Sequence, residues 1–392
     1  MSVYLGYAGG EKFFMEFRDK DYKYMKRAFE LAKKGEGFVS PNPLVGAVIV
    51  KDGKIIGEGY HSAFGEDHAE VMAIDSSDTS VKGADLYVNL EPCSHYGKTP
   101  PCSLKVIKSG IKRVFIANKD PNPKVAGGGI AQLKEGDIEV YENLMEEEGR
   151  KLNEAFFHFM EKKRPFYNLK VAQTIDGYIA APGGDARWIS GEESREYAHY
   201  LRHKLDAVLV GRGTAELDDP QLTVRHLDGE VSQPTRVILD SNLKISFESK
   251  LFREARKGDH LSDILIFTGP DVSTVKKSKF QELPGVRVIE LALNENKQLD
   301  LDDLSQKLIN YNLINILLEG GSRINYSFLN AGFIDKYYIF ISPKILGGND
   351  GIPVFAGAAP DKIYKSEKIN IDKTKRYGED ILITAYPKRG ES

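Results

Sequence analysis

The sequence contains very little cysteine, with only Cys93 and Cys102 among 392 residues. A small secreted protein held by disulfides would need more, so this class is excluded. No apolar run approaches the roughly 18 residues of a membrane-spanning helix. The segment 1–12 also lacks the basic stretch and apolar core of a signal peptide. We therefore expect a soluble, cytoplasmic protein with no membrane partner.

An excess of positive charge is also missing. The 54 Lys and Arg residues against 57 Asp and Glu residues leave a net charge of −3. A protein that coats nucleic acids normally carries a basic patch or a high isoelectric point, so we expect no nucleic-acid partner. A composition of 41% hydrophobic and 28% charged residues is typical of globular proteins. The length of 392 residues predicts two domains.

Hydrophobic periodicity predicts that both domains are α/β, because strands and helices alternate. In the first half we expect helices over 24–35 and from near His68 and Pro101, a strand over 44–50 that turns at 51–54 into a hairpin, and strands over 86–88 and 113–117. In the second half we expect strands over 166–171, 207–210, 235–240, 263–267, 315–318 and 336–341, with helices over 192–204 and 322–331.

A charged helical pattern over 146–163 lies between these halves and stops at Pro165. We place the domain boundary there, which predicts domains over 15–163 and 165–392. Residues 1–14 show no clear periodicity and are interpreted as an extension.

Both cysteines belong to a pattern of metal-binding residues. His68-Ala69-Glu70 is followed by a segment from Pro92 to Cys102 that begins Pro-Cys. One imidazole and two thiolates, from His68, Cys93 and Cys102, form a three-ligand zinc site that leaves one position open for water. The metal acidifies this water, and Glu70 can carry its protons. Hydrolytic nucleobase deaminases use such a set.

Taken singly, these residues have ordinary explanations: a polar residue at a helix start for His68, and a buried pair or disulfide for the cysteines. The spacing is also unusual, because the general deaminase signature ends in Cys-x-x-Cys, whereas residues 94–101 separate Cys93 from Cys102. This insert carries His95 and Lys98, which could meet a substrate or could be a solvated loop.

Glycine patterns indicate a second, weaker site. No Gly-x-Gly-x-x-Gly motif lies between a strand and a helix, and Gly127–Gly129 is interpreted as a flexible loop. The turns 211–214 and 319–322 each follow a predicted strand. The second turn opens a helix, whose free N–H groups could bind a pyrophosphate.

The segments Pro41–Ala47, His68–Val71 and Pro92–Cys102 closely resemble the deaminase half of the bifunctional riboflavin-biosynthesis deaminase/reductase family. The resemblance implies a cytidine-deaminase-like three-layer α/β/α domain. It also implies zinc bound by His68, Cys93 and Cys102, with Glu70 as the catalytic proton shuttle. The positions that it implies for substrate contact are Asn42, His61, His95, Lys98, Asp120 and Asn122.

The resemblance continues through Leu169–Ala172, Trp188–Ser190, Asp218–Arg225, Glu319–Gly321 and Ser342–Gly348 to the reductase half of the same family. It implies a dihydrofolate-reductase-like α/β domain that uses NADPH. Cofactor contacts are implied at Ala172, Trp188, Thr214, Asp218, Ser241, Gly321, Ser322, Arg323, Ile324, Asn325, Tyr326 and Ser327, and substrate contacts at Ala186, Arg202, Leu222, Arg225 and Glu319.

The implied function is a two-step enzyme that acts on a small phosphorylated pyrimidine. It would deaminate 2,5-diamino-6-(5-phosphoribosylamino)pyrimidin-4(3H)-one and then reduce the ribosyl side chain with NADPH, giving 5-amino-6-(5-phosphoribitylamino)uracil. Lys170 and Glu319 could polarise or protonate the opened sugar. Arg202 and Arg225 could bind its 5′-phosphate. We expect a homo-oligomer. A nucleic-acid deaminase and a nucleotide-binding regulator with structural zinc remain the alternatives.

Overall fold

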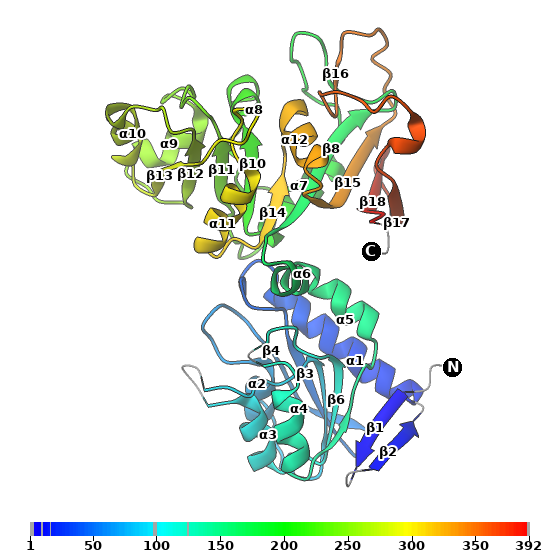
Figure 1. Ribbon diagram of the computed structural model, residues 1–392. Helices are drawn as coiled ribbons and strands as arrows, with labels where there is room; N and C mark the ends of the chain where they lie inside the picture. Colours follow the sequence, from blue (N-terminus) through cyan, green and yellow to red (C-terminus); the bar gives the residue numbers. More distant parts are fainter. Residues whose placement is uncertain (1–3, 9–10, 16, 97–99, 124, 390–392) are drawn as a thin grey trace. The chain divides into compact units, whose positions relative to one another are not determined.

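The computed structural model describes residues 4–8, 11–15, 17–96, 100–123 and 125–389 (Figure 1). The chain divides into two compact units, Met1–Lys163 and Arg164–Ser392. In the described part of the chain, no helix is both long and apolar enough to cross a membrane.

A mixed sheet forms the centre of the first unit. Its strands follow the order β2 (Glu11–Met15), β1 (Tyr4–Ala8), β7 (Glu139–Tyr141), β6 (Arg113–Asn118), β5 (Asp85–Leu90), β3 (Gly46–Lys51) and β4 (Lys54–Tyr60). Strands β5, β6 and β7 are parallel, and β3 and β4 form the antiparallel hairpin that the sequence predicted.

Helices cover both faces of this sheet and make three layers. Helices α2 (Ala69–Asp75), α3 (Cys102–Ser109) and α4 (Gly128–Glu135) pack on one face, and α1 (Asp19–Ala32) packs on the other (Figure 1). Successive side chains of β5 point to opposite faces of the sheet. Leu86 and Val88 therefore pack in the hydrophobic core under α2, α3 and α4, whereas Tyr87 packs in the core under α1. Helices α5 (Glu146–Leu152) and α6 (Glu154–Lys162) end the unit.

The second unit is built on a longer sheet. The order is β13 (Val286–Glu290), β12 (Ile264–Thr268), β11 (Thr235–Leu239), β10 (Ala207–Gly211), β14 (Asn315–Leu318), β8 (Phe166–Thr174), β15 (Ile334–Ser342), β18 (Asp380–Pro387) and β17 (Ile369–Tyr377). The strands from β13 to β15 are parallel, and β18 and β17 add an antiparallel edge.

This second sheet is also covered on both faces. Helices α11 (Leu301–Asn310) and α12 (Ser322–Asn330) bury apolar side chains on one face. Helices α7 (Glu192–Lys204), α9 (Arg253–Arg256) and α10 (Thr274–Gln281) do so on the other. The short helix α8 (Arg212–Leu217) follows β10, and a separate ladder pairs β16 (Ile352–Pro353) with β9 (Tyr178–Ala180).

Three local predictions were wrong. No strand was expected in the extension 1–14, but residues 4–8 and 11–15 form β1 and β2, which pair with each other, and β1 pairs with β7. The helix expected over 146–163 is broken at Asn153, whose side-chain amide accepts from Leu44 N at 2.8 Å and donates to Leu44 O at 2.9 Å. Gly127–Gly129 is not a flexible loop, since Gly127 caps α4 and the other two glycines begin it.

Candidate active sites

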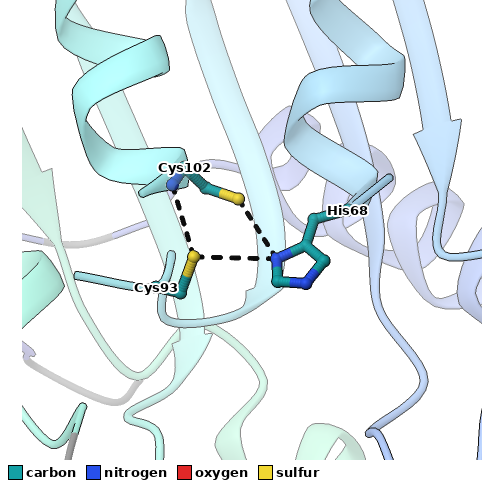
Figure 2. A group of neighbouring side chains, drawn as sticks. All are labelled: His68, Cys93 and Cys102. Atoms are coloured by element: carbon teal, nitrogen blue, oxygen red, sulfur yellow. Dashed lines mark hydrogen bonds between the residues drawn. The ribbon is translucent and has the colours of Figure 1, made fainter. Parts of the chain in front are cut away.

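The three predicted zinc ligands point toward one another within the first unit (Figure 2). His68 caps α2, Cys102 begins α3, and Cys93 follows β5. His68 Nδ1 lies 3.2 Å from Cys102 Sγ and 3.6 Å from Cys93 Sγ. The three ligand atoms lie within 4.8 Å of one another.

This geometry fits a tetrahedral zinc ion. Around a tetrahedral zinc ion with bonds of ordinary length, a thiolate sulfur and an imidazole nitrogen lie about 3.6 Å apart. Hydrogen bonds from Cys102 and His68 lower the pKa of Cys93 to about 4, which favours the thiolate that zinc requires. Within the described residues, the group contains no fourth His, Cys, Asp or Glu. The set therefore suits a catalytic ion with an open position and not a closed structural site.

Glu70 lies in the first turn of α2, two residues after His68, and its side chain is buried. Burial raises the pKa of Glu70 to about 7, and the nearby His68 only partly opposes this effect. A carboxyl group with a pKa near neutrality can both accept and return a proton.

Other predicted deaminase residues surround this centre. Asn42 Nδ2 donates to His61 Nε2 at 3.1 Å, and His61 Nδ1 donates to the Asp67 carbonyl at 3.1 Å. The ring centroids of His61 and His68 lie 5.4 Å apart, with the two rings packed edge to face. This chain of contacts connects Asn42 to His68, one of the predicted metal ligands.

The remaining predicted contacts lie on two loops. Asn122 N donates to Asp120 Oδ1 at 2.8 Å, and burial raises the pKa of Asp120 to about 6. His95 is exposed, and Lys98 lies outside the described residues. Glu91, a buried carboxylate that accepts from Asp120 N and Gly127 N, was not predicted from the sequence. Its position directly before Pro-Cys is the signal that could have drawn attention to it.

The second unit contains a cavity of about 960 Å³. It is lined by all the predicted reductase residues except Tyr326 and Ser327: Lys170, Ala172, Ala186, Trp188, Arg202, Thr214, Asp218, Leu222, Arg225, Ser241, Glu319, Gly321, Ser322, Arg323, Ile324 and Asn325. Tyr326 instead donates to Ala358 O at 3.0 Å, and Ser327 Oγ donates to Arg323 O at 3.0 Å.

A buried charge cluster lies in this cavity. Arg202 on α7 donates to both carboxylate oxygens of Glu319, at 2.8 and 2.6 Å. Burial alone would raise the pKa of Glu319, but Arg202 and Lys170 outweigh it and hold this pKa at about 2. Burial lowers the pKa of Lys170. A carboxylate that stays ionised beside an amine of reduced basicity is suited to proton transfer.

The cavity is also lined by His199, which was not predicted as a site residue although it lies one turn before Arg202 on a predicted helix. Its Nδ1 accepts from Arg225 N at 3.2 Å. Burial, helped by Arg202 and Arg225, lowers the pKa of His199 to about 4. The imidazole is therefore uncharged at neutral pH.

Trp188 lies at the edge of the cavity and is 67% exposed. The Arg195 guanidinium lies 4.6 Å from its ring centroid, and Lys344 donates to its carbonyl. The backbone of Trp188 has φ 62°, a left-handed conformation that is uncommon for a bulky residue.

Comparisons with known proteins match both halves of the chain. Residues 165–383, over half of the chain, match the family model described as the RibD C-terminal domain. Residues 18–118 match the cytidine and deoxycytidylate deaminase zinc-binding region. The riboflavin biosynthesis protein RibD of Aquifex aeolicus is 42% identical over 366 residues, which cover 93% of this chain and 98% of the relative. The chain belongs to the RibD family.

Solved structures of RibD-family proteins have the same fold. A Thermotoga maritima protein described as a diaminohydroxyphosphoribosylaminopyrimidine deaminase/5-amino-6-(5-phosphoribosylamino)uracil reductase is 39% identical, with a TM-score of 0.82, covering 94% of this chain and 99% of that one. Acinetobacter baumannii RibD gives a TM-score of 0.83 at 33% identity, with coverage of 94% and 99%.

Membership of the RibD family confirms the predicted fold class, a cytidine-deaminase-like α/β domain followed by a reductase α/β domain. It also makes the chain a bifunctional enzyme of riboflavin biosynthesis, a deaminase and a reductase. His68 and Cys93 lie, together with Cys102, inside the matched zinc-binding region.

Proposed function

We propose that the chain catalyses two successive steps on one phosphorylated pyrimidine. It hydrolyses the 2-amino group of 2,5-diamino-6-(5-phosphoribosylamino)pyrimidin-4(3H)-one and then reduces the ribosyl side chain, giving 5-amino-6-(5-phosphoribitylamino)uracil. The description of the Thermotoga maritima relative supports this pair of reactions, because that relative is matched over 94% of this chain. The cofactors we propose are Zn²⁺ and NADPH.

For deamination, we propose that His68, Cys93 and Cys102 hold the zinc ion. When bound, this ion would activate water for attack on the pyrimidine ring. Glu70 would take a proton from the water and deliver it to the departing amine, a role supported by its burial and by its place in the first turn of α2, two residues after His68. Asn42, His61, His95, Lys98, Asp120 and Asn122 would orient the substrate.

For reduction, we propose that the 960 Å³ cavity binds both NADPH and the deaminated product. NADPH would supply the hydride. Lys170 would supply the proton that balances hydride addition at the first sugar carbon, and Glu319 would hold Lys170 in place, as their mutual electrostatic attraction suggests. Arg202 and Arg225 lie on the same cavity and suit the 5′-phosphate.

The remaining proposed cofactor contacts are the cavity-lining positions Ala172, Trp188, Thr214, Asp218, Ser241 and Gly321–Asn325. Ala186 and Leu222 complete the proposed substrate contacts. We further propose that residues 15–163 carry the deaminase and residues 165–392 the reductase. Assembly as a homo-oligomer remains a prediction.

The substitution Glu70→Gln tests this assignment. The amide keeps the shape of the side chain but cannot accept a proton, so ammonia release should fall at least about a thousandfold. Zinc content should not change, and NADPH oxidation on addition of the deaminated intermediate should remain. Full ammonia release by the variant would refute the role of Glu70, and the absence of both reactions in the unsubstituted protein would refute the proposed function.

A further inference from the structure

Glu91 is a buried carboxylate, 3% exposed, which accepts from four backbone N–H groups among the described residues. Its Oε2 accepts from Asp120 N at 3.1 Å and from Gly127 N at 3.0 Å. Its Oε1 accepts from Gly129 N at 2.9 Å and from Ile130 N at 3.1 Å. One side chain therefore satisfies backbone donors at two separate places in the chain.

These two places are the ends of a single loop. The chain leaves β6 at Asn118 and enters α4 at Gly128. Between them, Glu91 contacts Asp120 near the start and Gly127 at the end. Its backbone N–H also donates to Asn118 O at 2.9 Å. Because both ends bind the same side chain, a displacement of Glu91 would disturb both ends of the loop together.

The loop carries proposed substrate contacts, and Glu91 is anchored beside a zinc ligand. Within the loop, Asn122 N donates a hydrogen bond to Asp120 Oδ1 at 2.8 Å. Cys93 follows Glu91 by two residues in the sequence. Close packing holds α4 at the same place, since a Cβ on Gly129 would lie 1.9 Å from Pro92 O. Glu91 therefore connects the segment that carries Cys93 to the loop that carries Asp120 and Asn122, and its contacts determine how far apart the two segments lie.

A carboxylate is well suited to this position. It has about four acceptor sites and no hydrogen to donate, so it can accept all four N–H groups. Hydrogen bonds to a charged acceptor are stronger than neutral ones, and two of these donors belong to the first turn of α4, where the helix dipole favours negative charge. A neutral amide could not accept from both pairs of donors.

We propose that Glu91 is a positioning residue for deamination, which holds the Asp120–Asn122 loop against the zinc site. This inference rests on the proposed function. Glu91 does not touch the reacting atoms in this scheme but acts through Asp120. Its loss should therefore weaken substrate binding more than the chemical step.

The test is Glu91→Gln in the full chain. The amide NH₂ must face two N–H donors, so the loop should shift, and the KM for the deaminase substrate should rise about tenfold or more while kcat changes less than about threefold. Zinc content and reductase activity should not change. Glu91→Asp keeps the charge but shortens the side chain by one methylene, so its KM should lie between that of the unsubstituted protein and that of Glu91→Gln. Glu135→Gln, an exposed position on the same helix, is the matched control.

A double substitution separates positioning from general support of the fold. If Glu91 acts through this loop, adding Glu91→Gln to Asp120→Ala should raise the KM by clearly less than Glu91→Gln does in the unsubstituted protein. Independent, additive effects would overturn the inference. So would loss of zinc or of the melting transition in both Glu91 variants, or a KM equal to that of the unsubstituted protein. Failure of the unsubstituted protein to release ammonia would instead refute the proposed function.

Discussion

The pairing of Arg202 with Glu319 shows how much depends on single residues in the reductase cavity. Both side chains are largely buried, with 13% and 9% of their surfaces exposed. Burying two charges is costly, and the cost is offset only when both partners are present with good geometry. The bidentate contact meets this condition.

Glu319→Gln should therefore lower the free energy of unfolding of the second unit by about 3–5 kcal/mol, because Arg202 would remain buried without its counter-charge. Reductase activity should also be lost. Chemical denaturation of the full chain measures the first effect and NADPH oxidation the second. Asp361→Asn removes an exposed pair with Lys365 and should cost no more than about 0.5 kcal/mol. Equal effects of the two substitutions would contradict the argument.

His199 should make the stability of the second unit depend on pH. Its pKa falls from an ordinary value of 6.5 to about 4 in the folded chain, so between these values the unfolded chain binds more protons. The stabilisation is complete above pH 6.5 and is lost as the pH falls through 4. The facing groups Arg202, Arg225 and His226 disfavour its protonation, while Glu319 favours it.

The measurement is denaturation of the second unit between pH 7 and pH 4, with His199→Phe as the comparison. The variant cannot titrate at this position, so its stability should change less over this range. Parallel curves for the two proteins would show that His199 does not contribute.

At the scale of elements, glycines on β3 and β4 allow helices to lie directly on these strands. A Cβ on Gly46 would lie 2.1 Å from Ala28 O in α1, and one on Gly59 would lie 2.4 Å from Ala69 O in α2. Because α2 carries Glu70 and is capped by His68, the close approach at Gly59 also affects where these proposed catalytic and zinc-binding groups lie.

Gly59→Ala should push α2 away from β4 and lower the free energy of unfolding of the first unit by about 1–3 kcal/mol. It should also weaken zinc binding, because His68 would move relative to Cys93. Thermal melting and zinc titration measure these effects. The control is Gly183→Ala, where an added Cβ meets nothing within 4 Å. Unchanged zinc affinity in the Gly59 variant would show that α2 can adjust.

At the scale of the whole molecule, the two sites belong to separate units of the chain. Removal of zinc by a chelator should therefore abolish ammonia release but leave NADPH oxidation with the deaminated intermediate unchanged. Returning zinc should restore ammonia release, because the ligands remain in place. Parallel loss of both reactions under chelation would show that the units depend on each other.

The predictability of the fold differed from place to place. Strongly patterned elements such as α7, α12 and the β3–β4 hairpin were predicted, because periodicity and turn residues are local signals. β1 and β2 were missed because they are defined by pairing with each other and with the distant β7. The break at Asn153 was missed for a similar reason, since it depends on contacts with Leu44.

The sequence by itself predicted the three proposed zinc ligands and the family, because His68, Cys93 and Cys102 are chemically distinctive and their spacing can be read along the chain. Only the tertiary structure decided that Glu91 joins both ends of the Asp120 loop and that His199 lies uncharged between arginines. The physical reason is that hydrogen bonding and burial join residues far apart in sequence, and these interactions leave no periodic or local signal.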